Sequence, residues 1–212
     1  LQRQVTLIFE RFFSLATHGR FAEAIGCLTE LLELSEVPAS QYATAYRLRG
    51  RAYQESEDFA AAEKDYTAAL ALLEEAIERR IAVLLDRGVL RAKVENHNGA
   101  IDDLTRVSNE TALLVEKRAR ALSLRAVVLT QIGDVSRAEE DLVRILSFEN
   151  ISLPVRLQAL RNRGTLLARR GSFETAVADF TAVISLAEGK AADVVDAVNL
   201  RGDVWLAMGE YQ

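Results

Sequence analysis

Residues 46–69, YRLRGRAYQESEDFAAAEKDYTAA, contain two helical stripes joined by a short polar turn. The first stripe follows the i, i+3, i+4, i+7 spacing of one helix face, and Glu57 and Asp58 separate it from the second. The stripes consist of Tyr46, Arg49, Gly50 and Tyr53, and then of Phe59, Ala62, Tyr66 and Ala69. This pattern predicts a helical hairpin, which cannot bury its apolar faces alone and needs neighbouring copies to cover them.

The pattern recurs every 38 residues along the chain. Three positions define the register: an alanine, a large apolar residue one helical turn later, and an arginine in the preceding stripe. The alanines are Ala24, Ala62, Ala100, Ala138 and Ala176, and the apolar residues are Leu28, Tyr66, Leu104, Leu142 and Phe180. The arginines are Arg11, Arg49, Arg87, Arg125, Arg163 and Arg201. A fixed period of this length predicts stacked hairpins with a core that runs from copy to copy.

These residues resemble the tetratricopeptide repeat. The resemblance is carried by Tyr46-x2-Arg49-Gly50-x2-Tyr53 and by Phe59-x2-Ala62-x3-Tyr66-x2-Ala69. It implies an all-α fold, a right-handed superhelical solenoid of helical hairpins. The common repeat has about 34 residues, so each copy here is one helical turn longer, and we expect the helices to be lengthened.

We expect a single array over residues 1-212, cut from a longer chain. It should contain five full repeats and the first helix of a sixth. The repeats are expected at approximately 5-42, 43-80, 81-118, 119-156, 157-194 and 195-212, the last being partial.

The composition excludes several classes of protein. The net charge is -5, half the residues are hydrophobic, and Cys27 is the only cysteine, so an internal disulfide framework is impossible. No apolar run approaches the roughly 20 residues of a membrane-spanning helix. We therefore expect a globular protein without a membrane partner, and the cytoplasm is the expected compartment.

An aspartate stands three residues after the alanine in four copies, on the same helix face as the alanine. Asp65 can reach Arg49 across its own hairpin or Arg87 in the next copy, and the spacing allows either pairing or both. We interpret the resulting series as a structural ion-pair ladder, because both residue types fall inside the apolar stripes. A row of cations for an acidic ligand is the alternative. The ladder comprises Arg49, Asp65, Arg87, Asp103, Arg125, Asp141, Arg163 and Asp179, and Cys27 replaces the aspartate in the first copy.

The resemblance implies that the first helices line a concave groove, with ligand contacts two residues before and after each arginine. The predicted peptide-binding residues are Arg47, Arg51, Leu85, Val89, Arg120, Val127, Arg161 and Thr165. Further groove candidates include Phe9, Phe13, Gln54, Lys93, Thr130, Gln158 and Arg169. Aliphatic residues surrounded by arginines favour a short segment that is both acidic and hydrophobic. No three successive copies carry the lysines and asparagines with which related proteins clamp the carboxylate tails of chaperones.

The sequence thus predicts a non-enzymatic scaffold that binds a peptide or protein segment in its groove. We expect no cofactor and no metal, because His18 and His97 lie apart near turns and no glycine-rich phosphate loop is present. The acidic net charge argues against a nucleic-acid partner. The alternative function is structural, with homodimers forming through the ends of the solenoid within a larger multidomain protein. Trp205 and Leu206, or Val5, Ile8 and Phe12, would form that contact.

Overall fold

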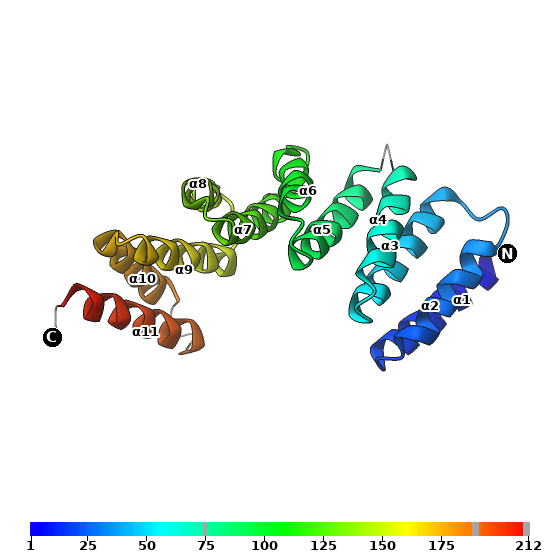
Figure 1. Ribbon diagram of the computed structural model, residues 1–212, viewed down its shortest axis with the longest axis horizontal. Coiled ribbons are helices and arrows are strands. Elements are labelled where there is room, and N and C mark those ends of the chain that lie inside the picture. Colours follow the sequence, from blue (N-terminus) through cyan, green and yellow to red (C-terminus); the bar gives the residue numbers. More distant parts are fainter. Residues whose placement is uncertain (74–75, 188–190, 210–212) are drawn as a thin grey trace. The chain divides into compact units, whose positions relative to one another are not determined.

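The structure is a computed structural model that describes residues 1–73, 76–187 and 191–209. These residues form eleven α-helices, and no strand occurs among them, which confirms the all-α fold (Figure 1). The first helices of the hairpins are α1 (Gln2–Thr17), α3 (Ala39–Glu55), α5 (Ile77–Lys93), α7 (Val115–Gln131), α9 (Leu153–Arg169) and α11 (Ala191–Met208). The second helices are α2 (Phe21–Glu33), α4 (Phe59–Ala71), α6 (His97–Asn109), α8 (Val135–Leu146) and α10 (Phe173–Leu186).

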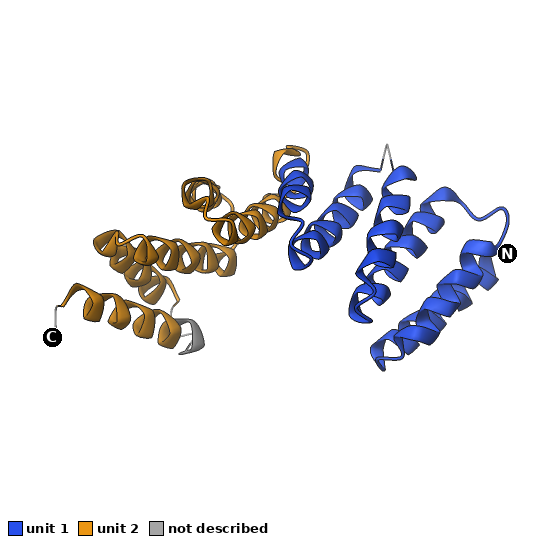
Figure 2. Ribbon diagram, in the orientation of Figure 1, with its two compact units in different colours: residues 1–107 blue, residues 108–212 orange. Residues whose placement is uncertain are grey.

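The chain divides into two compact units, Leu1–Val107 and Ser108–Gln212 (Figure 2). Within the first unit, each helix from α1 to α5 packs against the helix that follows it in the chain. The helices from α7 to α11 pack in the same order within the second unit. Each unit is therefore a stack of helical hairpins. Within the described part of the chain, no helix has the length and apolarity needed to cross a membrane.

The period of 38 residues is visible in the helix boundaries. Helices α3, α5, α7, α9 and α11 begin at Ala39, Ile77, Val115, Leu153 and Ala191. Helices α3, α5, α7 and α9 have 17 residues each, whereas their partners have 12 to 14. The structural repeats begin one helical turn before the expected frame of 43-80, because Pro38 is the N-cap residue of α3. Pro154 likewise lies in the first turn of α9, where its missing N–H leaves no unsatisfied donor.

Each hairpin turns at a residue with a left-handed backbone, again at intervals of 38. These residues are Gly19, Glu57, Glu95, Gly133, Gly171 and Gly209, with φ between 60 and 83°. In the second hairpin, the Asp58 amide reaches back to the Tyr53 carbonyl at 2.9 Å, which is the closing bond of a Schellman motif. Asp58 then caps α4 by accepting a hydrogen bond from the Ala61 amide at 3.1 Å. The short polar turn predicted from Glu57 and Asp58 is confirmed.

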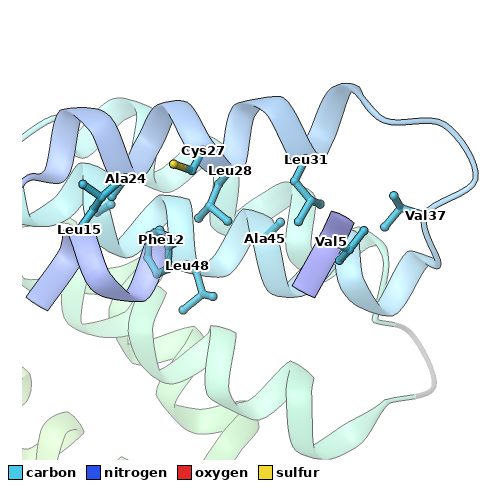
Figure 3. Close-up of a cluster of buried hydrophobic side chains, with 11 residues drawn as sticks. Val5, Phe12, Leu15, Ala24, Cys27, Leu28, Leu31, Val37, Ala45 and Leu48 are labelled. Carbon is cyan, nitrogen blue, oxygen red and sulfur yellow. The ribbon is translucent and has the colours of Figure 1, made fainter. Parts of the chain in front are cut away.

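The core of the first unit is formed by apolar residues of α1, α2 and α3 (Figure 3). Cys27 is 2% exposed in this cluster, so it fills the place of the ladder aspartate as a small buried hydrophobe. Val5 and Phe12 are buried in the same cluster, and they are therefore unavailable for the dimer contact proposed for them from sequence.

The glycine after the repeat arginine allows two helices of a hairpin to approach closely. A Cβ atom at Gly50 would lie 2.9 Å from Tyr66 Cε1, and one at Gly164 would lie 2.8 Å from Phe180 Cε1. Both rings are completely buried. Burial also raises the pKa of the Tyr66 phenol, whose hydroxyl donates to Gln54 Oε1 at 3.3 Å. The glycine is thus required by the large apolar residue on the facing helix.

Candidate functional site

The repeat arginines and aspartates form two-pronged ion pairs within single hairpins. Arg49 Nε donates to Asp65 Oδ2 at 2.7 Å, and Arg49 Nη2 donates to Asp65 Oδ1 at 2.8 Å. The same geometry occurs in Arg87–Asp103, Arg125–Asp141 and Arg163–Asp179, always across 16 residues. The hydrogen bonds to Asp65 and Asp179 raise the pKa of Arg49 and of Arg163 against the opposing effect of burial. The structure therefore selects the pairing inside each hairpin from the alternatives that the sequence left open.

A third nitrogen of the arginine reaches the preceding hairpin. Arg49 Nη1 donates to Thr29 Oγ1 at 3.0 Å, and Arg87 Nη1 donates to Thr67 Oγ1 at 3.1 Å. Arg201 Nη1 donates to Thr181 Oγ1 at 3.2 Å in the second unit. Sequence reasoning missed these threonines, although they also follow the period of 38, with Val143 as the exception. Each of these three arginines thus ties one hairpin to the one before it.

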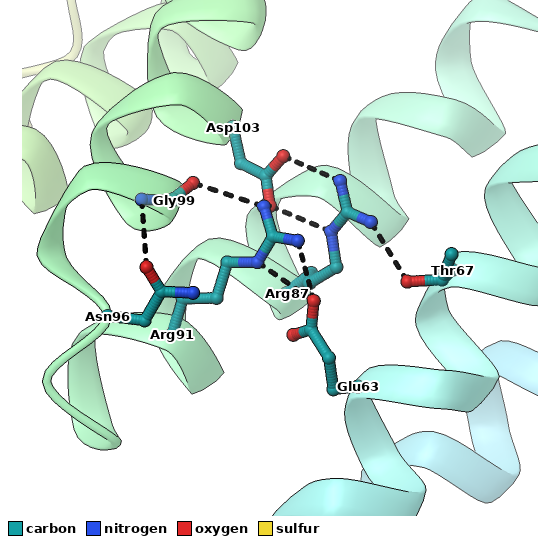
Figure 4. A network of polar contacts seen from close by, with 7 residues as sticks. All are labelled: Glu63, Thr67, Arg87, Arg91, Asn96, Gly99 and Asp103. Atoms are coloured by element: carbon teal, nitrogen blue, oxygen red, sulfur yellow. Dashed lines mark hydrogen bonds and ion pairs between the residues drawn. The ribbon is translucent and has the colours of Figure 1, made fainter.

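The polar network is largest around Asp103 (Figure 4). Arg91 Nη1 donates to Asp103 Oδ2 at 3.0 Å, while Arg91 Nη2 donates to Glu63 Oε1 at 2.6 Å. Burial alone would lower the pKa of Arg91, but the hydrogen bond to Glu63 and the charge of Asp103 raise it. The side chains of Arg87 and Asp103 are 9% and 1% exposed. These groups are already paired and covered, so they are structural rather than available to a ligand.

A pocket of about 250 Å³ lies in the second unit, between α7, α8 and α9. It is lined by Ala126, Val127, Thr130, Gln131, Leu142, Asn162, Thr165, Leu166 and Arg169. Two of the predicted groove residues, Val127 and Thr165, meet there, together with the further candidates Thr130 and Arg169. Sequence reasoning did not select Gln131 or Leu166 as groove residues, because neither position falls in the phase taken for ligand contacts.

The pocket has an apolar wall and a polar rim. Val127 is 50% exposed, an unusually open position for a valine beside buried neighbours. Ala126 replaces the glycine that follows the repeat arginine in most other copies, and Leu142 replaces the ring found at Tyr66 and Phe180. Arg169 is exposed, and within the described residues it forms no ion pair. The arrangement offers van der Waals contact to an apolar side chain and a cation to a nearby carboxylate.

The predicted groove residues of the first unit differ in accessibility. Arg47 Nε lies 2.7 Å from Asp86 Oδ2, so its charge is already neutralised. Leu85 is only 7% exposed and offers little surface, whereas Val89 is half-buried. Arg51 is exposed, and no ion pair engages it in the part of the chain that the structure describes.

The other two predicted arginines lie in the second unit but outside the pocket lining. Arg120 is exposed on α7. Arg161 Nη1 lies 3.4 Å from Asp196 Oδ2, and its Nη2 donates to Gln158. The structure therefore brings Val127 and Thr165 together but leaves Arg120 and Arg161 at separate positions. Across the described residues, no group of three or more histidine, cysteine or acidic side chains is placed to hold a metal ion.

Comparison with protein families matches residues 13–77 to the tetratricopeptide repeat. Comparison with the curated proteins found no match. Among solved structures, a tetratricopeptide repeat protein from Parabacteroides merdae has a TM-score of 0.75 at 19% identity, over 98% of this chain and 75% of that one.

Two further structures have the same fold. MamA 41-end from Desulfovibrio magneticus RS-1 has a TM-score of 0.67 at 16% identity, over 89% of this chain and 97% of that one. YrrB, described as a tetratricopeptide repeat protein with an unusual peptide-binding site, has a TM-score of 0.62 at 18% identity. The likeness to YrrB covers 89% of each chain. At these identities the likeness shows a shared fold.

Proposed function

We propose that this chain, a tetratricopeptide repeat protein, binds a segment of a partner protein in the pocket between α7 and α9 of its second unit. The fold in general supports a protein-interaction scaffold. Proteins of this family are generally scaffolds without enzymatic activity of their own. The finer proposal concerns the place of binding and the chemistry of the segment.

The observation that carries the proposal is the exposure of Val127 at the apolar wall of the pocket. Exposed aliphatic side chains beside a concave surface are typical of interaction sites. An apolar side chain of the segment would contact Val127 and Leu166, and a neighbouring carboxylate would reach Arg169. The ligand is therefore a short segment in which an apolar residue lies next to an aspartate or glutamate. The peptide-binding site named for YrrB supports peptide recognition as an activity of this fold.

The first unit offers a separate surface that we include in the proposal. Arg51 on α3 is exposed, and Val89 on α5 is half-buried. Because Asp86 already neutralises Arg47, Arg51 is the arginine of this pair that would receive an acidic group. A variant carrying Arg51→Glu and Val89→Asp tests this surface independently of the pocket.

The experiment for the pocket compares Val127→Asp with Leu114→Asp. Both substitutions place a carboxylate on an exposed aliphatic position of the second unit, and Leu114 is 69% exposed at the N-cap of α7, where aspartate is favourable. A displayed library of short random peptides is selected against the unsubstituted protein, and the affinities of the selected peptides are then measured. We expect peptides with adjacent apolar and acidic residues, bound about tenfold more weakly by Val127→Asp. Unchanged binding by Leu114→Asp completes the expected result.

Two results would contradict the proposal. Peptides that bind Val127→Asp as tightly as the unsubstituted protein would place recognition elsewhere. Selected peptides without acidic residues would remove Arg169 from the site. A correctly folded Arg169→Glu variant gives the second test, because it reverses the charge at the rim without altering the apolar wall.

Self-association is the second candidate function. The observation that favours it is the exposure of Trp205 and Leu206 on α11, at 37% and 56%. Sedimentation velocity over a range of protein concentrations tests it, and a monomer at every concentration would exclude it.

A further inference from the structure

Helix α11 presents a face that the preceding first helices bury. Val195 is 55% exposed, whereas the residues 38 and 76 positions earlier, Leu157 and Ala119, are 3% and 0% exposed. Val198 is 43% exposed, and its counterparts Leu160 and Leu122 are 8% and 0% exposed. Trp205 on the same helix is also exposed, while Leu167 and Leu129 at its level are 5% and 0% exposed.

The arginine of α11, Arg201, lacks the carboxylate that every ladder arginine receives. Its guanidinium lies over the Trp205 ring at 4.7 Å and donates to Thr181 through Nη1. Its Nε is buried and has no hydrogen-bond partner among the described residues. In Arg49, Arg87, Arg125 and Arg163 the same atom donates to an aspartate Oδ2 at 2.7 to 2.8 Å. A buried donor without an acceptor is unfavourable, so Arg201 is placed to bind a carboxylate.

The neighbouring glycine leaves an open slot beside that arginine. A Cβ atom at Gly202 would have no described atom within 4 Å, apart from its own backbone neighbours. At the equivalent Gly50, Gly88 and Gly164, a Cβ atom would lie 2.8 to 3.1 Å from a large apolar side chain. Those side chains are Tyr66, Leu104 and Phe180, and each directly follows the ladder aspartate in sequence. The slot at Gly202 is thus adjacent to the position that a carboxylate would occupy.

We infer that α11 binds an amphipathic helix of another protein, one that carries the sequence Ala-x-x-Asp followed by Phe, Tyr or Leu. The aspartate would pair with Arg201, the large side chain would fill the slot over Gly202, and the apolar face would cover Val198 and Trp205. The register comes from the internal hairpins, in which alanine, aspartate and large side chain recur at the same spacing. Binding of this kind is helix-to-helix packing, independent of the pocket between α7 and α9.

The sequence argues that the helix belongs to a different protein and not to a second copy. The required pattern begins at Ala62, Ala100, Ala138 and Ala176, and in all four places the aspartate is already paired within its hairpin. Helix α11 itself does not contain the pattern, so two copies of this helix cannot satisfy each other's Arg201 in this way.

The test uses a stapled helical peptide with the sequence of residues 172–187, which contains Ala176, Asp179 and Phe180. Trp205 is the only tryptophan of the chain, so its fluorescence reports on the site directly. We expect the peptide to shift the emission to shorter wavelength, and the Asp179→Asn peptide to bind about tenfold more weakly. The protein variant Arg201→Gln should lose the same factor, with no additional loss when both changes are combined.

Matched variants separate this site from the proposed pocket and from loss of folding. Arg169→Glu should bind the peptide normally, because Arg169 lies in the pocket and not on α11. Gly202→Val should fill the slot and weaken binding while the helical circular dichroism stays unchanged. Equal affinity for the original peptide and for its Asp179→Asn version would overturn the inference, as would the absence of any fluorescence shift. A dimer in which Trp205 is already covered would also overturn it, by assigning the face to a second copy.

Discussion

Arg87 and Asp103 form a two-pronged ion pair across the hairpin of α5 and α6, with both hydrogen bonds at 2.8 Å. The two side chains are almost completely buried, and Asp103 accepts a third hydrogen bond from Arg91. A buried pair contributes little net stability compared with apolar residues of the same volume, but each partner depends on the other. Removal of the aspartate leaves two guanidinium groups without their acceptor.

Asp103→Ala is therefore expected to lower the free energy of unfolding by about 3 to 5 kcal/mol. Urea denaturation monitored by circular dichroism measures the change. The adjacent Asp102 is exposed, so Asp102→Ala serves as a matched control with little expected effect. Peptide affinity per folded molecule should not change, because the pair lies outside the pocket. Equal stability of the two variants would contradict the structural role of the ladder.

Val143→Thr is expected to stabilise the protein by about 1 kcal/mol. Val143 occupies the position at which Thr29, Thr67 and Thr181 accept a hydrogen bond from an arginine. The substitution would supply the same acceptor to Arg163 on α9. Val143→Ala, measured in the same thermal denaturation experiment, controls for the loss of the branched side chain. If Val143→Thr were no more stable than the original protein, this reading of the threonine series would be wrong.

Glu95→Gly is expected to stabilise the protein by about 1 kcal/mol, because Glu95 has φ of 60°. Four of the six equivalent turns already have glycine at this position. Glu95→Ala is the control, since alanine keeps the Cβ atom that makes the left-handed backbone costly. Differential scanning calorimetry should show a higher midpoint for glycine alone. If both variants behaved alike, the strain would be negligible.

Gly164→Ala is expected to destabilise the second unit by about 1 to 3 kcal/mol, because the added Cβ would lie 2.8 Å from Phe180 Cε1. The combination with Phe180→Leu recreates the pair formed naturally by Ala126 and Leu142. The double variant should therefore lose less stability than the sum of the single variants, by denaturation in urea. Strict additivity would show that the ring does not oppose residue 164.

The repeat architecture was predictable because its signals are local and recur at one spacing. The alanine, arginine and aspartate positions predicted the hairpins, and the structure contains them with helix starts 38 residues apart. The pairing of Asp65 was not predictable, because Arg49 and Arg87 lie at comparable positions on the two sides of it. Glu57 and Glu95 were recognised as polar turn residues, but glutamate carries no signal for a left-handed backbone.

The candidate site was predictable only in part. Val127 and Thr165 were found through their phase relative to the arginine, and they line one pocket. The same phase selected Leu85, which packing between helices buries, and Arg47, whose charge is taken by Asp86. Such contacts between successive first helices depend on distances between hairpins, and a periodicity within one hairpin contains no information about them. The identity of the bound segment stays a prediction.

Val143 has one more consequence, which concerns how the second unit comes apart. In a stack of hairpins, stability is a sum of the terms within each hairpin and the coupling between neighbours. The hairpin of α9 and α10 receives no threonine hydroxyl from the hairpin of α7 and α8, since Val143 stands in the acceptor position of that link. The coupling between these two hairpins is therefore reduced by one bond. Under denaturant or a pulling force, the boundary between α8 and α9 is where cooperative unfolding should divide, and amide hydrogen exchange would show α7 and α9 losing protection at different denaturant concentrations.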